Sequence, residues 1–247
     1  MNTLIENLDR DEITKAVQAA ENRTAGEIVP YVVPRSDSYE IAVWRGASAF
    51  ALIAITVALL IVQFYQGWGL GWIFTPWGVA LLALTGGTLG AVLGAYVSPV
   101  QRLLAGRDVL DTTVHRVAMQ AFLEEEVFST RDRTGILLFI SLQEHRIEVL
   151  GDTGINAKVS EDEWVDIVTR IRKGIKNRNL TAGLVDAIRM CGKLLERRGV
   201  DIREDDENEL SDAIRTPGFE PDALSEPAPG SEGARSEDPA DSDDVTS

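Results

Sequence analysis

Gly135-Ile136-Leu137-Leu138-Phe139-Ile140-Ser141-Leu142 is a nearly continuous apolar run in the second half of the chain. A run of this length is typical of a β-strand that is buried on both faces. After a turn at residues 143–145, the segment Arg146–Leu150 alternates apolar and charged residues, which predicts an amphipathic strand paired back in a hairpin. A sheet buried on both faces needs helices on each side.

The segments around these two strands supply helices and one more strand. Asp9 and Glu12 form a capping box that opens a helix. A strand follows at residues 28–33, where Pro30 removes a backbone donor and so indicates a position near the sheet edge. Three later helices are predicted to begin at Asp111, at a second capping box spanning Ser160 to Glu163, and at Thr181, which we expect to cap the last helix.

This order of elements predicts an α/β fold. The expected architecture is a three-layer α/β/α sandwich with a small mixed sheet, interrupted by a two-helix transmembrane hairpin. The first two strands should be parallel, because a long crossover joins them, and the third should be antiparallel to the second. Three strands make a thin sheet, which leaves room for a further short strand.

The predicted hairpin lies in a stretch of 56 positions, Gly46–Gln101, that holds no charged residue. Within it, Ala47–Phe64 and Gly78–Val97 are each long enough to cross a bilayer as a helix. The glycine- and tryptophan-rich segment Tyr65–Trp77 between them predicts a tight turn at the membrane interface. The alternative is a buried apolar hairpin of a soluble fold.

Two features of the hairpin predict its topology and packing. Arginines flank it at both ends, and its turn has no Lys or Arg, so the positive-inside bias predicts a multi-pass protein of the cell membrane with both soluble segments in the cytoplasm. Gly86, Gly90 and Gly94 repeat along one face of the second span. Such a face allows close helix packing, and we favour packing on the first span over dimerisation.

The formal net charge of −15 is concentrated at the carboxyl end. Residues 199–247 contain sixteen Asp or Glu and three Lys or Arg, and from Thr216 onward large apolar residues are scarce, which predicts disorder. A solubilising tail and an anionic docking arm are both consistent with this composition. The predicted organisation is therefore 1–45 and 102–198 as two parts of one domain, 46–101 as the hairpin, and 199–247 as an acidic tail.

Several motifs occur in order and together suggest a family: Thr24–Val29, Thr130–Ser141, Arg146–Ile155, Ser160–Ile171 and Gly183–Leu195. As an ordered set they resemble the TPM domain, named for thylakoid-lumen, photosystem and membrane proteins. The resemblance covers most of residues 10–198 outside the hairpin. It implies an α/β/α sandwich linked to membranes, and it implies calcium binding or acid phosphatase activity, which have been ascribed to some members.

The chain departs from the commoner family pattern at three places. It reads Asp152-Thr153-Gly154-Ile155-Asn156 where many members have Gly-Tyr-Gly-Leu-Glu, and Val159-Ser160-Glu161 where many have Leu-Pro-Asp. The hairpin also lies inside the domain, whereas the commoner pattern has a signal peptide in front and an anchor behind.

The predicted topology collects polar residues at two rims of the sheet. One rim, at the start of the parallel strands, should gather Glu27, Arg131, Arg133, Asp152 and Glu161. The opposite rim, which leads into the hairpin, should hold Asp37, Ser38, Tyr39, Glu144 and His145. The carboxyl ends of parallel strands are the usual ligand crevice of open α/β sheets.

The first rim offers candidate binding residues. Asp152 and Glu161 could supply carboxylate oxygens to Ca²⁺, and Arg131 and Arg133 are candidates for anion binding. The competing interpretation is an ion pair between Asp152 and an arginine. We expect no cofactor other than Ca²⁺.

No catalytic residue is assigned, because nothing in the sequence pairs an activated nucleophile with a base. Cys191, the only cysteine, lies on the apolar face of a predicted helix and is expected to be a core residue. We expect a non-enzymatic interaction or assembly module for membrane proteins. The alternative is a metal-dependent phosphatase-like hydrolase. The expected partners are the lipid bilayer and other membrane proteins, with no nucleic acid.

Overall fold

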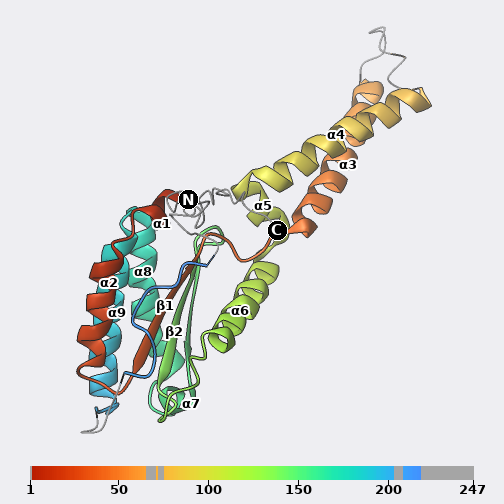
Figure 1. Cartoon of the computed structure of the whole chain (residues 1–247). Helices are drawn as coiled ribbons and strands as arrows, with labels where there is room; N and C mark the ends of the chain where they lie inside the picture. Colours follow the sequence, from red (N-terminus) through yellow and green to blue (C-terminus); the bar gives the residue numbers. More distant parts are fainter. Residues whose placement is uncertain (1, 65–70, 72–74, 203–207, 218–247) are drawn as a thin grey trace, which may run out of the picture.

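The computed structural model describes residues 2–64, 71, 75–202 and 208–217, which form a layered domain from which a helical hairpin projects (Figure 1). The sheet has the strand order β1 (Glu27–Val33), β2 (Gly135–Ser141) and β3 (Arg146–Gly151). β1 pairs parallel with β2, and β2 pairs antiparallel with β3. The predicted mixed sheet is therefore confirmed.

Helices cover both faces of this sheet. On one face, α2 (Arg10–Glu21), α8 (Val165–Lys176) and α9 (Leu180–Arg197) share a core with the even-numbered side chains of β2, such as Leu138. On the other face, α6 (Arg107–Glu124) packs on the odd-numbered side chains of the same strand. All seven residues of β2 are buried, as expected for a strand between two helical layers. The three-layer α/β/α fold is thus confirmed.

Two of the four predicted helix starts were correct, those at Asp9 and Ser160, whereas α6 begins at Arg107 and so includes the predicted start Asp111 in its second turn. Asp9 accepts a hydrogen bond from the backbone N–H of Glu12 (2.9 Å), and the backbone N–H of Ser160 donates to Glu163 (3.0 Å). The cap predicted at Thr181 was wrong, because Asn179 precedes the helix and accepts from the N–H of Ala182. The Thr181 hydroxyl instead accepts from the backbone N–H of Asp9 (3.1 Å), so a tertiary contact takes the place of the cap. The short helices α1 (Asn2–Glu6), α5 (Ser98–Ala105) and α7 (Thr153–Asn156) were not predicted from the sequence.

The free edge of β1 is closed by residues 208–217, here called the strap (blue in Figure 1). Arg215 donates its N–H to the Pro30 carbonyl and accepts from the N–H of Val32, each at 2.9 Å. Farther along the same edge, the carboxylate of Glu21 accepts from the N–H of Ile28 (2.8 Å). Pro30 therefore lies on an outer strand, as predicted.

The strap lies within the stretch 199–247 that the sequence analysis assigned to the acidic tail. A one-residue bridge between Arg215 and Tyr31 adds a short parallel pairing to the edge of the sheet. The folded domain thus extends past the boundary predicted at residue 198. The tail from residue 218 onward lies outside the described residues.

The hairpin consists of α3 (Glu40–Phe64) and α4 (Pro76–Tyr96), both long and apolar enough to cross a membrane. Only 11% and 17% of their most apolar windows are buried within the structure, unlike core helices of soluble proteins. The predicted turn falls largely on residues 65–70 and 72–74, outside the described residues.

The two helices of the hairpin pack through the glycine face of α4. A Cβ atom placed on Gly90 would lie 2.1 Å from the carbonyl oxygen of Gly46, and one on Gly94 would lie 2.7 Å from that of Ala42. Glycine at these positions lets the two backbones touch. Packing of this face on the first span, which we favoured over dimerisation, is confirmed.

Candidate functional site

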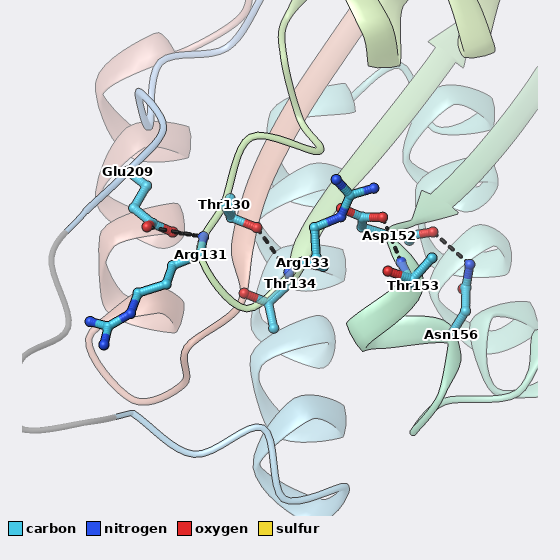
Figure 2. A network of polar contacts seen from close by, with 9 residues as sticks. Thr130, Arg131, Arg133, Thr134, Asp152, Thr153, Asn156 and Glu209 are labelled. Carbon is cyan, nitrogen blue, oxygen red and sulfur yellow. Dashed lines mark hydrogen bonds and ion pairs between the residues drawn. The ribbon is translucent and has the colours of Figure 1, made fainter.

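The loop before β2 and the end of β3 meet at one rim of the sheet, as predicted (Figure 2). The N–H of Asp152 donates to the carbonyl of Gly135 (2.9 Å), and the N–H of Gly154 donates to the carbonyl of Arg133 (2.9 Å). A side chain on Gly154 would collide with the backbone of this loop, 2.3 Å from the carbonyl oxygen of Asp132. The rim is therefore a close contact between two loops.

Asp152 is the buried anion of this rim, with 4% of its surface exposed. Its Oδ1 accepts from the N–H of Thr153 (2.6 Å) at the start of α7, and its Oδ2 lies 2.7 Å from Nε of Arg133. A guanidinium in this position neutralises the carboxylate that a calcium ion would need. Ca²⁺ also requires six to eight oxygen ligands, so the donor set around Asp152 fits this ion poorly.

The other candidates at this rim do not converge on Asp152. Figure 2 shows the side chain of Arg131 directed away from that of Arg133, and the backbone N–H of Arg131 donates to the carboxylate of Glu209 in the strap (3.0 Å). Glu161 lies at the exposed start of the 3-10 turn η2 (Glu161–Trp164). Within the described ranges, no group of three or more His, Cys, Asp or Glu residues is placed to hold a metal ion. Calcium binding by Asp152 and Glu161, and anion binding by the two arginines, stay predictions.

A cluster of acidic side chains lies beside this rim, where the strap meets the start of β1. Glu27 is buried, with 7% of its surface exposed, and one of its oxygens accepts weakly from the N–H of Glu209 (3.4 Å). Burial, opposed by backbone hydrogen bonds and reinforced by the charges of Glu209 and Asp212, raises the pKa of Glu27 to about 7. Burial likewise raises the pKa of Glu21 to about 9, and the neighbouring acids Glu27 and Asp212 add to the rise.

The sequence placed Glu27 at this rim, but not its acidic neighbours. Glu21 is on a helix and Asp212 is in the strap, and no sequence pattern links them to β1. Their proximity follows from the docking of the strap. That docking was not predicted, because the acidic composition of residues 199–247 indicated a tail.

The opposite rim, beneath the hairpin, holds another buried acidic side chain. Glu144, 2% exposed, accepts from the N–H of Ser36 (3.1 Å) and from the hydroxyl of Ser141. Tyr39 is also buried there, and burial together with the charge of Glu144 raises its pKa. The pKa of His145 is lowered by burial and by the charge of Arg102, so its imidazole is neutral near pH 7.

Two glutamines connect this rim to the hairpin. Gln101, on α5 directly after α4, donates to the carbonyl of Ser38 (2.9 Å), and Gln143 in the β2–β3 turn donates to Gln101 (2.5 Å). Gln101 is only 3% exposed. On the hairpin side, Arg45 donates to the last carbonyls of α5, those of Leu104 (2.9 Å) and Ala105 (2.7 Å). We call this set of contacts the polar joint.

The polar joint is the strongest candidate for a functional feature. Of these residues, Gln101 is buried, Gln143 is half-buried, and Ser38 and Arg45 are exposed. Hydrogen bonds to a buried side chain favour one arrangement of the elements that they join. Here they join the carboxyl end of the parallel strands to both ends of the hairpin. The sequence placed Ser38, Tyr39 and Glu144 at this rim, but missed Gln101 because it ends the uncharged stretch and looks like a span terminus.

Cys191 is a core residue, as predicted. It is fully buried on α9, and burial raises the pKa of its thiol to about 12. A thiol that does not ionise near neutral pH is a poor nucleophile.

A comparison with known families finds a match to the second half of the domain. Residues 102–194 match the sequence model of a family described as TPM domain. Among solved structures, the chain is similar to the NMR structure of the BA42 protein from the psychrophilic bacterium Bizionia argentinensis, with 19% identity and a TM-score of 0.49. That alignment covers 85% of this chain and 95% of BA42. No curated protein gave a significant match.

Proposed function

Because residues 102–194 match the family model of the TPM domain, we propose that this chain is a membrane-anchored TPM protein that acts as a non-enzymatic interaction or assembly module for other membrane proteins. The observation that carries the proposal is the polar joint. It holds the domain at a fixed position against an apolar hairpin whose outer surface is exposed.

The exposed side chains of the hairpin supply the membrane part of the proposal. Leu52, Leu59 and Leu84 are each more than 60% exposed. A lipid bilayer would cover these side chains and remove their apolar surface from water, which favours insertion of the hairpin into the membrane. A partner in the same membrane could then contact the hairpin and the domain together, because the hydrogen bonds of the polar joint favour one position of the domain against the hairpin.

The proposed orientation places the domain in the cytoplasm of a cell whose membrane the hairpin crosses twice. Arg35, Arg45, Arg102 and Arg107 flank the spans, and they support this orientation through the positive-inside bias. Protease added to intact cells should leave the domain uncut and should cut it after permeabilisation. Cleavage in intact cells would overturn the orientation.

The test of the assembly role uses the full chain in its native membrane. Photo-crosslinking residues placed at Leu59 in the hairpin and at exposed Met119 on α6 should capture the same membrane protein. The double variant Gln101→Ala/Gln143→Ala should lose capture from Met119 and keep it from Leu59, because the domain is no longer held in place. Identical capture patterns with and without the joint would contradict the proposal.

The alternative is a metal-dependent phosphatase-like hydrolase, a function that the family resemblance implies. The detergent-solubilised full chain should be assayed with a generic phosphate ester, with and without Ca²⁺ or Mg²⁺. Metal-dependent turnover that Asp152→Ala abolishes would favour the hydrolase. Turnover that this variant leaves unchanged would point to a contaminating enzyme.

A further inference from the structure

Helix α5 turns back at the end of α4 and runs along the base of the hairpin, where it contacts α3 and α4 (Figure 1). Gly94, near the end of α4, packs against the backbone of Ala42. Leu104, near the end of α5, packs one turn farther from the domain, because its Cδ1 atom lies 3.1 Å from the position of a Cβ atom on Gly46. Arg45 holds this end of α5 through two backbone carbonyls. The carboxyl end of α5 is therefore level with Gly46.

In the membrane-anchored protein proposed above, the bilayer boundary on the domain side lies near Gly46. This residue begins the uncharged stretch of the sequence. From Gly46 to Phe64, where α3 ends, the helix rises about 27 Å, and the hydrocarbon core of a bilayer is about 30 Å thick. The uncharged part of α3 is thus only just long enough to cross. The end of α5 then lies where the hydrocarbon core meets the lipid headgroups.

Exposed aromatic side chains lie close to the same level. Trp44 is two residues before Gly46 on α3 and is 73% exposed, and Tyr96, the last residue of α4, is 83% exposed. Because Gly94 packs against Ala42, Tyr96 lies somewhat nearer to the domain than Trp44. Trp and Tyr are enriched at the membrane–water interface, where an apolar ring with a polar group is favoured. The base of the hairpin therefore has the side chains of an interfacial belt.

One side of α5 is bound to the rest of the protein and the other is uncovered. Gln101 is buried and belongs to the polar joint. Pro99 and Leu103, four residues apart on the other side, are exposed, and Leu103 is 81% exposed to the part of the chain that the structure describes. A single exposed leucine is common on a surface that faces water. This leucine, however, lies next to the residue that packs on Gly46, and so joins the apolar belt.

We propose that α5 is an interfacial helix, whose exposed side with Leu103 lies among the lipid headgroups and the first carbons of the acyl chains. This side continues the lipid-facing surface of the hairpin, so its occupant is the bilayer. Gln101 bonds the same helix to Ser38 and Gln143 of the domain. The helix thus favours one position of the domain at the membrane surface. The inference rests on the proposed membrane anchoring and adds a third lipid contact to the two helices of the hairpin.

The contact is apolar and does not select the headgroup by charge. Residues 35–45 and 102–111, which flank the hairpin, contain four arginines and four acidic residues. A balanced set of charges gives no net attraction to anionic lipid. We therefore expect α5 to lie in the interface of a bilayer made only of zwitterionic lipid.

The test measures depth in the bilayer for the full chain in nanodiscs of zwitterionic lipid. A fluorophore is placed on Leu103→Cys, on Val57→Cys in the hairpin, or on Leu123→Cys near the far end of α6, where another exposed leucine serves as the matched control. Cys191 is fully buried with a raised thiol pKa, so the fluorophore reacts at the introduced cysteine. The lipids carry a quenching nitroxide either near the start of the acyl chain or near its end.

The three positions should give three different results. The fluorophore at position 103 should lose emission with the shallow nitroxide and keep it with the deep one, and the fluorophore at position 57 should show the reverse. The fluorophore at position 123 should keep its emission with both. No quenching at position 103, with deep quenching at position 57, would overturn the interfacial role of α5 and leave the hairpin in the membrane. No quenching at position 57 would contradict the membrane anchoring itself, and this inference with it.

Two further results separate lipid from other occupants and from an effect of the fluorophore. Blue-shifted emission at position 103 that neither nitroxide quenches would show that protein covers α5, and would overturn the proposal. Without a fluorophore, Leu103→Cys in nanodiscs should react more slowly than Leu123→Cys with a charged thiol reagent that does not enter the bilayer. Equal rates would mean that position 103 faces water, which would also overturn the proposal. Quenching at position 103 that requires anionic lipid would contradict the apolar contact.

Discussion

The acidic cluster at the start of β1 predicts that the strap is held less firmly as the pH rises. The strap packs on Glu27, whose ordinary pKa of about 4.5 is raised to about 7. Between these two values, the state with the strap docked binds a proton that the open state releases. Protonated Glu27 therefore stabilises the docked state at low pH, and this stabilisation is lost as the pH increases through 7.

The size of the effect follows from the pKa. Each unit of difference corresponds to about 1.4 kcal/mol, so full exposure of Glu27 on opening would lower the opening free energy by about 3 kcal/mol between pH 4.5 and pH 7 or above. Opening the strap leaves Glu27 partly covered by the sheet and by α2. We therefore expect about half of this value, which is roughly a tenfold loss of protection.

Hydrogen exchange measures this opening directly. The amide of Arg215 donates to Pro30 and the amide of Val32 donates to Arg215, so both exchange only when the strap opens. Their protection, corrected for the intrinsic pH dependence of exchange, should fall between pH 5.5 and pH 8. Glu27→Gln keeps a hydrogen-bond acceptor for the strap but does not titrate. It should therefore remove the part of the pH dependence of protection that comes from Glu27. Glu21, with a pKa of about 9, adds a similar dependence that continues to higher pH.

The matched control is Glu12→Gln, which removes an exposed carboxylate from the same helix as Glu21. It should leave the pH dependence as in the wild type. Equal protection of Arg215 at both pH values in the wild type would refute the linkage. The same decline in Glu27→Gln and the wild type would show that Glu27 is not its source.

Three further predictions concern the hairpin, the polar joint and the rim. Gly90→Leu should destabilise the helix pair by about 1–3 kcal/mol, because a side chain there collides with the first span; unfolding in increasing SDS, with exposed Leu89→Ala as the control, measures it. Gln101→Ala removes two hydrogen bonds and should cost about 1–3 kcal/mol; thermal unfolding in detergent should show a lower Tm than for exposed Gln120→Ala. If Asp152 and Glu161 bind Ca²⁺, the ion should raise the Tm of the wild type and not of Asp152→Ala; an equal Tm with and without calcium in the wild type would leave the ion pair with Arg133 as the role of Asp152.

Much of the fold could be predicted because its main elements carry local signals. The apolar run at 135–142 marks the central strand, and Pro30 marks the edge strand. The strand directions follow from the connections alone, since a long crossover favours parallel pairing and a short turn requires antiparallel pairing. The glycine face of the second span indicates its partner because only a close neighbour explains residues without side chains.

The missed features depend on contacts between distant segments. The strap sits in acidic sequence, and its pairing uses backbone atoms, which leave no side-chain pattern. In the sequence, Gln101 has the position of a polar residue at the end of an apolar helix. Its contacts with Ser38 and Gln143 are formed only in the folded domain. At the first rim, topology correctly brought Asp152 to the loop that holds both arginines. The topology does not predict which of the two arginines pairs with Asp152, because the direction of each side chain depends on the path of one tight loop.

The closure of the outer strand has a practical consequence for any shortened version of the molecule. A chain cut at residue 198 would lose Arg215 and leave the amide of Val32 and the carbonyl of Pro30 open to solvent. Unpaired strand edges recruit other strands, so such a fragment should self-associate through its sheet. Anyone who ends the protein at residue 198 would then measure an oligomer created by the cut.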